Sequence, residues 1–214
     1  MDLSRAEFER LYAENDLRIA LIGMSNIGKS YTAARLAKHL NFGLVEVDKI
    51  IWETLGQDSM ADFATWQGQP YSDGYAEREA KSIALETEAT ASALNRKSGN
   101  AILDTTGSVI YTDASVRKKL TRDWYIIHIT ASDADIERLK VQYFEQPKPL
   151  IWHGHFNQRD TETPTESIMR CYPDLLASRA KNYAALADAK ISSNVILDHT
   201  LSIEEIFERL KPAI

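Results

Sequence analysis

The chain has 214 residues, with 25 Lys or Arg against 31 Asp or Glu, and carries a formal net charge of −6 at pH 7. This length predicts one α/β domain, and the acidic balance disfavours a nucleic-acid partner. One cysteine, Cys171, excludes an internal disulfide, and no apolar run is long enough to cross a membrane, so we expect a cytoplasmic protein.

The first segment, residues 1–16, is predicted to be an amphipathic helix that packs on the domain. Ser4 and Glu7 have the spacing of a capping box, and Phe8, Leu11 and Tyr12 fall on one helical face. The segment is charged throughout and lacks the apolar core of a signal peptide.

A nucleotide-binding loop is predicted between an apolar strand, Arg18 to Gly23, and a helix that runs to Leu40. Its sequence, GMSNIGKS, matches G-x-x-x-x-G-K-[ST] at every fixed position. Backbone N–H groups would surround a polyphosphate, the lysine would contact its β- and γ-phosphates, and the serine hydroxyl would bind Mg²⁺. The expected cofactors are ATP and Mg²⁺. The predicted nucleotide-binding residues are Gly23, Asn26, Ile27, Gly28, Lys29, Ser30 and Tyr31.

The rest of the chain alternates between apolar runs and helical patterns. Strands are predicted over residues 42–48, 101–107, 124–130 and 191–198, and helices over residues 75–96, 132–144, 175–189 and 202–210. This alternation predicts a five-stranded parallel sheet covered by helices on both faces. Such a fold needs no partner to complete its core, and we expect a monomer.

Two long segments with weak patterning, residues 49–74 and 145–173, interrupt this alternation. Inserts of this length in a compact domain are usually functional. In a phosphate-binding α/β protein they would lie over the carboxyl ends of the strands, where ligands bind. We expect the first to form a substrate-binding insert and the second a lid that excludes water during transfer.

In their order along the chain, several segments resemble those of the shikimate kinases, within the P-loop kinases that are similar to nucleoside-monophosphate kinases. The resemblance runs from about Arg18 to Ala189. GMSNIGKS looks like the family's Walker A loop. The other similar segments are VEVDKIIWETLG for its D-x-D segment, residues 58–79 for its substrate-binding region, LDTTGSV for its triple-Gly turn, KPL for its lid R-P-L, and SRAKNYAALAD for the run after the lid.

The resemblance implies an ATP-dependent kinase that phosphorylates a hydroxyl group of a small molecule. Asp48 matches the residue that holds the acceptor hydroxyl or acts as its base, and Glu46 matches a residue that holds Mg²⁺ through water. Gly107 matches the middle glycine of the turn, and Arg179 matches the arginine that binds the substrate carboxylate. Lys148 matches the lid arginine that reaches the phosphates. With Lys29, the implied catalytic residues are Asp48 and Lys148.

Several positions depart from the family pattern on the acceptor side. The substrate-binding arginine falls on Ala76, and Arg78 would point elsewhere on its helix. Thr106 and Ser108 replace two glycines of the turn, D-x-D has become E-x-D, and Lys148 lacks the bidentate fork of arginine. These changes leave the identity of the acceptor open, with shikimate as the first candidate.

Two carboxylates have alternative interpretations. Asp48 follows a strand and is expected to orient or deprotonate the acceptor, but it would also suit the start of the helix KIIWETL. Asp104 follows the apolar run AIL and would bind Mg²⁺ through water, or else stabilise a turn. The predicted metal residues are therefore Ser30, Glu46 and Asp104.

Other side chains near the predicted site have ordinary structural interpretations beside functional ones. We prefer an interpretation as surface charges over one as phosphate ligands for Arg138, Lys140 and Arg159. We likewise prefer a place in the lid over a metal site for His153 and His155. Trp52, Trp66 and Trp152 are equally consistent with walls of the acceptor pocket and with core packing. The alternative functions are a nucleotide-binding regulatory protein of this fold and, less favoured, a nucleic-acid end kinase.

Overall fold

The computed structural model describes residues 1, 3–56, 59–95, 99–145 and 150–213. Its centre is a parallel sheet with the strand order β2-β3-β1-β4-β5. All four neighbouring strand pairs are parallel, which confirms the predicted five-stranded parallel sheet. The strands are β1 (Arg18–Ile22), β2 (Gly43–Glu46), β3 (Ala101–Asp104), β4 (Tyr125–Thr130) and β5 (Ala189–Ser192).

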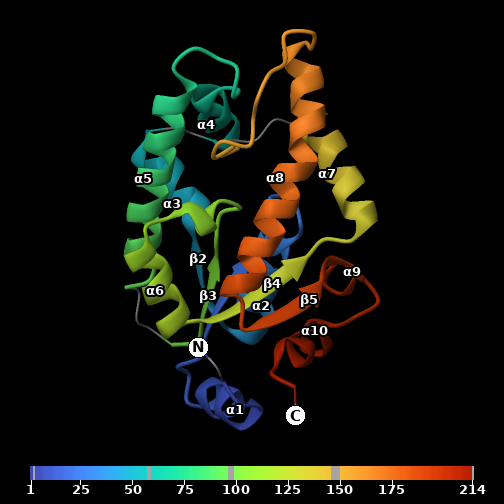
Figure 1. The fold of residues 1–214 in the computed structure, drawn as a ribbon. Coiled ribbons are helices and arrows are strands. Elements are labelled where there is room, and N and C mark those ends of the chain that lie inside the picture. Colours follow the sequence, from blue (N-terminus) through green and yellow to red (C-terminus); the bar gives the residue numbers. More distant parts are fainter. Residues whose placement is uncertain (2, 57–58, 96–98, 146–149, 214) are drawn as a thin grey trace.

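Helices flank the sheet, and the two long ones, α5 and α8, rise beyond its carboxyl edge with α4 near the top of α5 (Figure 1). Helix α2 contacts β1, β2 and β3, and α10 packs on α2 and β5, whereas α6 and α8 contact β4. The helices are α1 (Arg5–Ala13), α2 (Lys29–Leu40), α3 (Val47–Thr54), α4 (Met60–Gln67), α5 (Tyr75–Ala93), α6 (Ala114–Asp123), α7 (Asp133–Glu145), α8 (Pro164–Leu186), α9 (Ser193–Ile196) and α10 (Ile203–Leu210).

The register of the sheet brings three chain segments to one edge. Leu21 of β1 and Glu46 of β2 both pair with Asp104 of β3. The loop after β1, the start of α3 and the turn after β3 therefore begin beside one another. Ligands of open α/β sheets bind at this carboxyl edge.

The core is built from the apolar strands and the inward faces of the helices. Residues 19–22 of β1 are fully buried, as are Ala33 and Leu36 of α2. The predicted capping box of α1 is present, since the Ser4 hydroxyl accepts a hydrogen bond from the Glu7 N–H and the Glu7 carboxylate accepts one from the Ser4 N–H. Phe8 of α1 is fully buried, and its burial contributes about 1.5–3 kcal/mol.

Three predicted strands have wrong boundaries. The third strand ends at Asp104 rather than at residue 107. The second strand ends at Glu46 rather than at residue 48, so Asp48 lies in the first turn of α3. The fifth strand is Ala189–Ser192 rather than residues 191–198. The Ser192 hydroxyl accepts a hydrogen bond from the Asn194 N–H and begins the short helix α9. Val195 and Ile196 therefore belong to a helical turn, although residues 191–198 were predicted to form a strand.

The segment predicted to form a lid, residues 145–173, includes the first part of a long helix. Helix α8 begins at Pro164, eleven residues before the predicted start at 175, and continues through Pro173. Thr163 and Glu166 form a capping box there, and proline is tolerated in a first helical turn because its missing N–H has no intrahelical partner. Residues 49–74 contain α3 and α4, and α6 was not predicted.

Within the described residues, no helix has both the length and the apolarity that a membrane span requires. Cys171 lies buried in α8 as a free thiol, as expected for a structural cysteine.

Candidate active site

The predicted nucleotide-binding loop connects β1 to α2. Gly23 has φ = 147°, and a Cβ atom there would lie 2.8 Å from the carbonyl oxygen of Ile129, so the loop can approach β4 only with glycine at this position. Lys29 is buried in the first turn of α2. Its Nζ donates hydrogen bonds to the carbonyl oxygens of Gly23 (3.0 Å) and Met24 (2.9 Å). The ammonium is therefore held inside the curve of the loop.

The other residues predicted for the loop differ in exposure. Asn26 has φ = 62°, a left-handed conformation that asparagine tolerates better than most residues, and its carbonyl oxygen accepts a hydrogen bond from Arg138 (3.2 Å). Ile27 is fully buried and anchors the loop in the core, so only its backbone is available to a ligand. Ser30 is exposed and lines the cleft described below. Tyr31 is 41% exposed and contacts the His199 ring edge-on.

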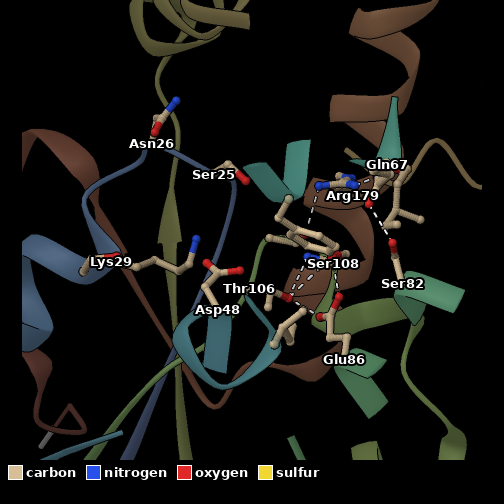
Figure 2. A pocket seen from close by; sticks show the side chains of 15 residues that line it. Ser25, Asn26, Lys29, Asp48, Gln67, Ser82, Glu86, Thr106, Ser108 and Arg179 are labelled. Carbon is tan, nitrogen blue, oxygen red and sulfur yellow. Dashed lines mark hydrogen bonds between the residues drawn. The ribbon is translucent and has the colours of Figure 1, made fainter. Parts of the chain in front are cut away.

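An open cleft with an empty volume of about 610 Å³ begins at this loop and extends away from it between α3, α5, α8 and the turn after β3. Figure 2 shows its polar side chains. The cleft is lined by Ser25, Asn26, Lys29, Ser30, Asp48, Ile51, Phe63, Gln67, Ser82, Glu86, Thr106, Gly107, Ser108, Ile151 and Arg179. Small-molecule sites are usually concave and mostly apolar with a few converging polar groups, and this cleft has the converging groups but a more polar lining.

Asp48 lies in the cleft next to the loop. In Figure 2 the ends of the Asp48 and Lys29 side chains point toward one another. Both side chains line the cleft, so the structure brings together a predicted phosphate-binding lysine and a predicted acceptor-binding carboxylate. This arrangement holds although Asp48 is helical rather than at a strand end.

The predicted metal residues are brought together only in part. Glu46 and Asp104 are paired in the register of β2 and β3, with Glu46 exposed and Asp104 buried, and neither lines the cleft. The Ser30 hydroxyl and these carboxylates are hard oxygen donors, which is the chemistry that Mg²⁺ requires. The residues present therefore fit the ion that the sequence motif predicts.

Glu86 of α5 is a cleft residue that the sequence analysis missed. Its side chain is 3% exposed. One carboxylate oxygen accepts a hydrogen bond from the Thr106 hydroxyl, and the other accepts one from the Ser108 hydroxyl (2.5 Å). The two residues that replace glycines in the turn after β3 are therefore the partners of this carboxylate.

The environment of Glu86 favours its neutral form. Burial raises the pKa of the carboxyl from 4.5 to about 7, and the nearby Asp48 charge adds to the increase. The hydrogen bonds from Ser108 and Thr106 and the charge of Arg179 act in the opposite direction but do not cancel the effect of burial. A carboxyl group that titrates near neutrality in a cleft is typical of functional sites.

Arg179 of α8 is buried against the turn after β3. Nη1 donates a hydrogen bond to the Gly107 carbonyl oxygen (2.9 Å), and Nη2 donates one to the Ile151 carbonyl oxygen (2.7 Å). The guanidinium lies over the Tyr111 ring, 5.5 Å from its centroid, and Tyr183 also donates a hydrogen bond to Gly107. Arg179 and Gly107 thus lie in the cleft as predicted, but both terminal nitrogens of Arg179 already have backbone partners.

The face of α5 that lines the cleft carries Ser82 and Glu86. Ala76, the position matched to a substrate-binding arginine, is exposed and does not line the cleft. Arg78 donates a hydrogen bond from Nε to the Gln67 carbonyl oxygen (2.9 Å), which ties α4 to α5 and confirms that this arginine points elsewhere. A polar stripe at residues 75, 79, 82 and 86, with helical spacing, was the signal in the sequence that could have revealed Glu86.

Tyr75 and Glu79 of this stripe, together with Gln67 of α4, hold the segment from Leu150 to His153. Gln67 and Tyr75 donate hydrogen bonds to the Leu150 carbonyl oxygen, at 2.7 Å each. Glu79 accepts hydrogen bonds from the backbone N–H groups of Trp152 (2.6 Å) and His153. Ile151 is thereby fixed as one wall of the cleft.

Several predicted residues lie elsewhere. Lys148 falls outside the described residues. Arg159 is exposed and pairs with Glu162 at 3.6 Å, and His153 stacks on Tyr111 with ring centroids 4.3 Å apart. None of the three tryptophans considered as pocket walls lines the cleft, where Ile51, Phe63 and Ile151 form the apolar surface instead. Within the described part of the chain, no group of three or more His, Cys, Asp or Glu side chains is arranged to hold a metal.

A sequence model described as shikimate kinase matches residues 25–211 of the chain. A search of curated protein sequences found no match.

Solved structures of similar fold include three bacterial shikimate kinases. The enzyme from Bacteroides thetaiotaomicron has a TM-score of 0.62 and 20% identity, over 91% of this chain and 96% of that one. The enzyme from Acinetobacter baumannii in complex with shikimate has a TM-score of 0.61 and 20% identity, over 92% of both chains. The enzyme from Aquifex aeolicus has a TM-score of 0.57 and 19% identity, over 91% of this chain and 93% of that one.

Proposed function

Because the chain belongs to the shikimate kinase family, we propose that it transfers the γ-phosphoryl group of ATP to a hydroxyl group of a small-molecule acceptor. The observation that carries this proposal is the placement of Lys29 and Asp48 at one end of the cleft, with their side chains turned toward one another (Figure 2). A cation for the phosphates and a carboxylate for the acceptor hydroxyl are the minimum that such a transfer needs.

The proposed roles rest on the family and, for the described residues, on the positions of their side chains. Lys29 and the backbone N–H groups of residues 23–31 bind the β- and γ-phosphates. Asp48 accepts a hydrogen bond from the acceptor hydroxyl, aligns its oxygen with the γ-phosphorus and takes its proton as the new bond forms. Gly107 and Arg179 shape the acceptor side of the cleft. Lys148, in the lid, is proposed to neutralise the negative charge that develops during transfer.

Ser30, with Glu46 or Asp104 through water, is proposed to hold Mg²⁺. Bound there, Mg²⁺ would neutralise charge on the phosphate oxygens during transfer. The contribution of the chain is to supply hard oxygen donors at the start of α2 and at the ends of β2 and β3.

The experiment that tests the proposal is ADP release by the purified protein with Mg²⁺–ATP, with and without an acceptor. The acceptor panel contains shikimate, other polyols, sugar acids and nucleosides. The Lys29→Ala variant should lose acceptor-dependent release, whereas Lys38→Ala, an exposed lysine of the same helix, should keep it.

A second result would favour a nucleotide-binding regulatory protein of this fold. In that case ATP would bind in a Lys29-dependent way, but no acceptor of the panel would stimulate ADP release. The engagement of both Arg179 terminal nitrogens by backbone carbonyls is the observation consistent with this alternative.

A further inference from the structure

The acceptor end of the cleft has an unusual balance of charge for a site that would bind a carboxylate. The charged side chains that line the cleft are Lys29, Asp48, Glu86 and Arg179. Lys29 lies in the loop that is proposed to hold the phosphates. Asp48 faces Lys29, so Glu86 and Arg179 are the charged side chains farther from the loop among the residues that the structure describes, and this part of the cleft has no excess of positive charge.

The guanidinium of Arg179 is poorly placed to bind a carboxylate of a ligand. Arg179 is 2% exposed, and its two terminal nitrogens donate to the carbonyls of Gly107 and Ile151. Each terminal nitrogen has a second N–H, and Nε has no hydrogen-bond partner among the described residues, but the guanidinium is almost entirely buried. A ligand carboxylate would therefore reach the remaining N–H groups only if the surrounding side chains moved.

Helix α5 adds an acid and no base to this part of the cleft. Ser82 and Glu86 face inward, whereas Arg78 is bound to the Gln67 carbonyl and Lys81 lies over the Trp66 ring. In the ionised state Glu86 would repel a ligand carboxylate across a largely buried site, where charges are weakly screened.

The remaining lining suits a neutral molecule with many hydroxyl groups. Ser25, Ser82, Thr106 and Ser108 line the cleft with hydroxyl groups. Ser82 donates its proton to Gln67, and Thr106 and Ser108 donate theirs to Glu86, so these three oxygens face a ligand as acceptors. The apolar side of the cleft consists of Ile51, Phe63 and Ile151, and Phe63 is held in place by stacking on Trp66 at 5.6 Å. Hydroxyls donate and accept hydrogen bonds, so they match these polar groups, and the C–H face of a sugar or cyclitol ring can pack on the apolar side.

We propose that the acceptor is an uncharged polyhydroxy ring, a sugar or a cyclitol, and that Glu86 selects it by accepting hydrogen bonds from ring hydroxyls and by repelling acceptors that carry a carboxylate. This inference rests on the proposed kinase function and names the acceptor class of the same site. Because Glu86 also receives hydrogen bonds from Thr106 and Ser108, the residues at the two altered turn positions orient it for this role.

The test is a comparison of two ligands that differ in charge but hardly in shape. Binding of shikimate and of its primary carboxamide to the wild-type protein is measured by calorimetry, in the presence of Mg²⁺ and a non-hydrolysable ATP analogue, at about pH 8.5, where Glu86 is ionised because its pKa is about 7. Myo-inositol and D-glucose serve as further neutral probes. We expect the carboxamide to bind about 10-fold or more tightly than shikimate, and at least one of myo-inositol and D-glucose to bind.

The Glu86→Gln variant should reduce this preference for the carboxamide by about 10-fold, mainly through tighter binding of shikimate. The matched control is Glu88→Gln, which removes an exposed carboxylate two residues away on the same helix and should keep the preference. The wild-type comparison needs no variant, so it decides the question even if Glu86→Gln does not fold.

The proposal is overturned if shikimate binds as well as its carboxamide, or if none of the three neutral probes binds up to its solubility limit. It is also overturned if a folded Glu86→Gln protein keeps the wild-type ratio. Failure of the kinase proposal is a separate result. The neutral probes would then bind with the expected preference, but no acceptor would stimulate release of ADP.

Discussion

Nη1 of Arg179 lies 2.9 Å from the carbonyl oxygen of Gly107, so one hydrogen bond joins α8 to the turn after β3 across 72 positions of sequence. The other terminal nitrogen of the same side chain holds Ile151. Two walls of the cleft are thus tied to each other through one guanidinium.

The Arg179→Lys substitution should destabilise the protein. Lysine keeps the charge but cannot bridge two carbonyls with the fixed geometry of the guanidinium, so a buried carbonyl would lose its partner. We expect the free energy of unfolding to fall by about 1–3 kcal/mol in denaturant titrations. The control, Arg159→Lys at an exposed arginine, should change it by less than about 0.5 kcal/mol. Equal stability of both variants would show that the bridge is dispensable.

The Gly107→Ala substitution should disturb the nucleotide-binding loop. An added Cβ atom would lie 2.7 Å from the Ser25 Oγ and 3.1 Å from the Ser25 backbone nitrogen, so the loop or the turn must shift. We expect weaker ATP binding, measured by calorimetry.

The double variant with Ser25→Ala removes the closer of these two contacts and should recover part of the lost affinity. Ser25→Ala alone serves as the reference. If the double variant is no better than Gly107→Ala, the steric explanation is wrong.

The Asp48→Asn substitution should separate binding of ATP from transfer. Asparagine has nearly the same shape but cannot take a proton from the acceptor, so kcat should fall by about 10²–10⁴-fold while ATP affinity changes little. The control, Glu53→Gln, removes an exposed carboxylate from the same helix. A near-normal kcat for Asp48→Asn would remove Asp48 from the catalytic role.

The titration of Glu86 should be visible in the pH dependence of stability. Its pKa is raised from 4.5 to about 7 by burial, so the native state binds a proton that the unfolded chain has released between these values. Its contribution to stability is therefore fully present below pH 4.5 and is lost as the pH rises to about 7.

The stability of Glu86→Gln relative to wild type should accordingly increase over this interval and stay constant above it. Urea titrations of both proteins across the interval, with Glu88→Gln as the control for loss of a charge alone, provide the measurement. A difference between wild type and Glu86→Gln that does not change with pH would contradict the assigned ionisation.

The nucleotide half of the site could be predicted from sequence because its signal is local. The loop from Gly23 to Ser30 consists of consecutive residues, so its sequence pattern alone was sufficient to predict it. Asp48 lies in the cleft as predicted but in a different element, since an apolar run does not show whether its last residues continue a strand or begin a helix. The same ambiguity arose at the fifth strand, because the residues up to Ile196 that were predicted to continue the strand form α9 instead.

The acceptor half depends on contacts between distant segments. Glu86 meets Thr106 and Ser108 from 20 and 22 positions away, and the polar stripe of α5 that contains it does not by itself distinguish a buried face from a solvated one. The engagement of Arg179 with the backbone was likewise invisible, because its partners are carbonyl groups that every residue carries. Helix α6 was missed since the segment from 108 to 123 has few apolar residues with helical spacing.

The position of Lys29 has a consequence for the thermodynamics of nucleotide binding. A lysine side chain carries about 2 kcal/mol of rotamer entropy, and here folding has already fixed it, with Nζ on the carbonyls of Gly23 and Met24. An incoming polyphosphate therefore exchanges one set of acceptors for another around a preorganised ammonium. The entropic penalty of association falls on the ligand and on the solvent, and little of it on this side chain.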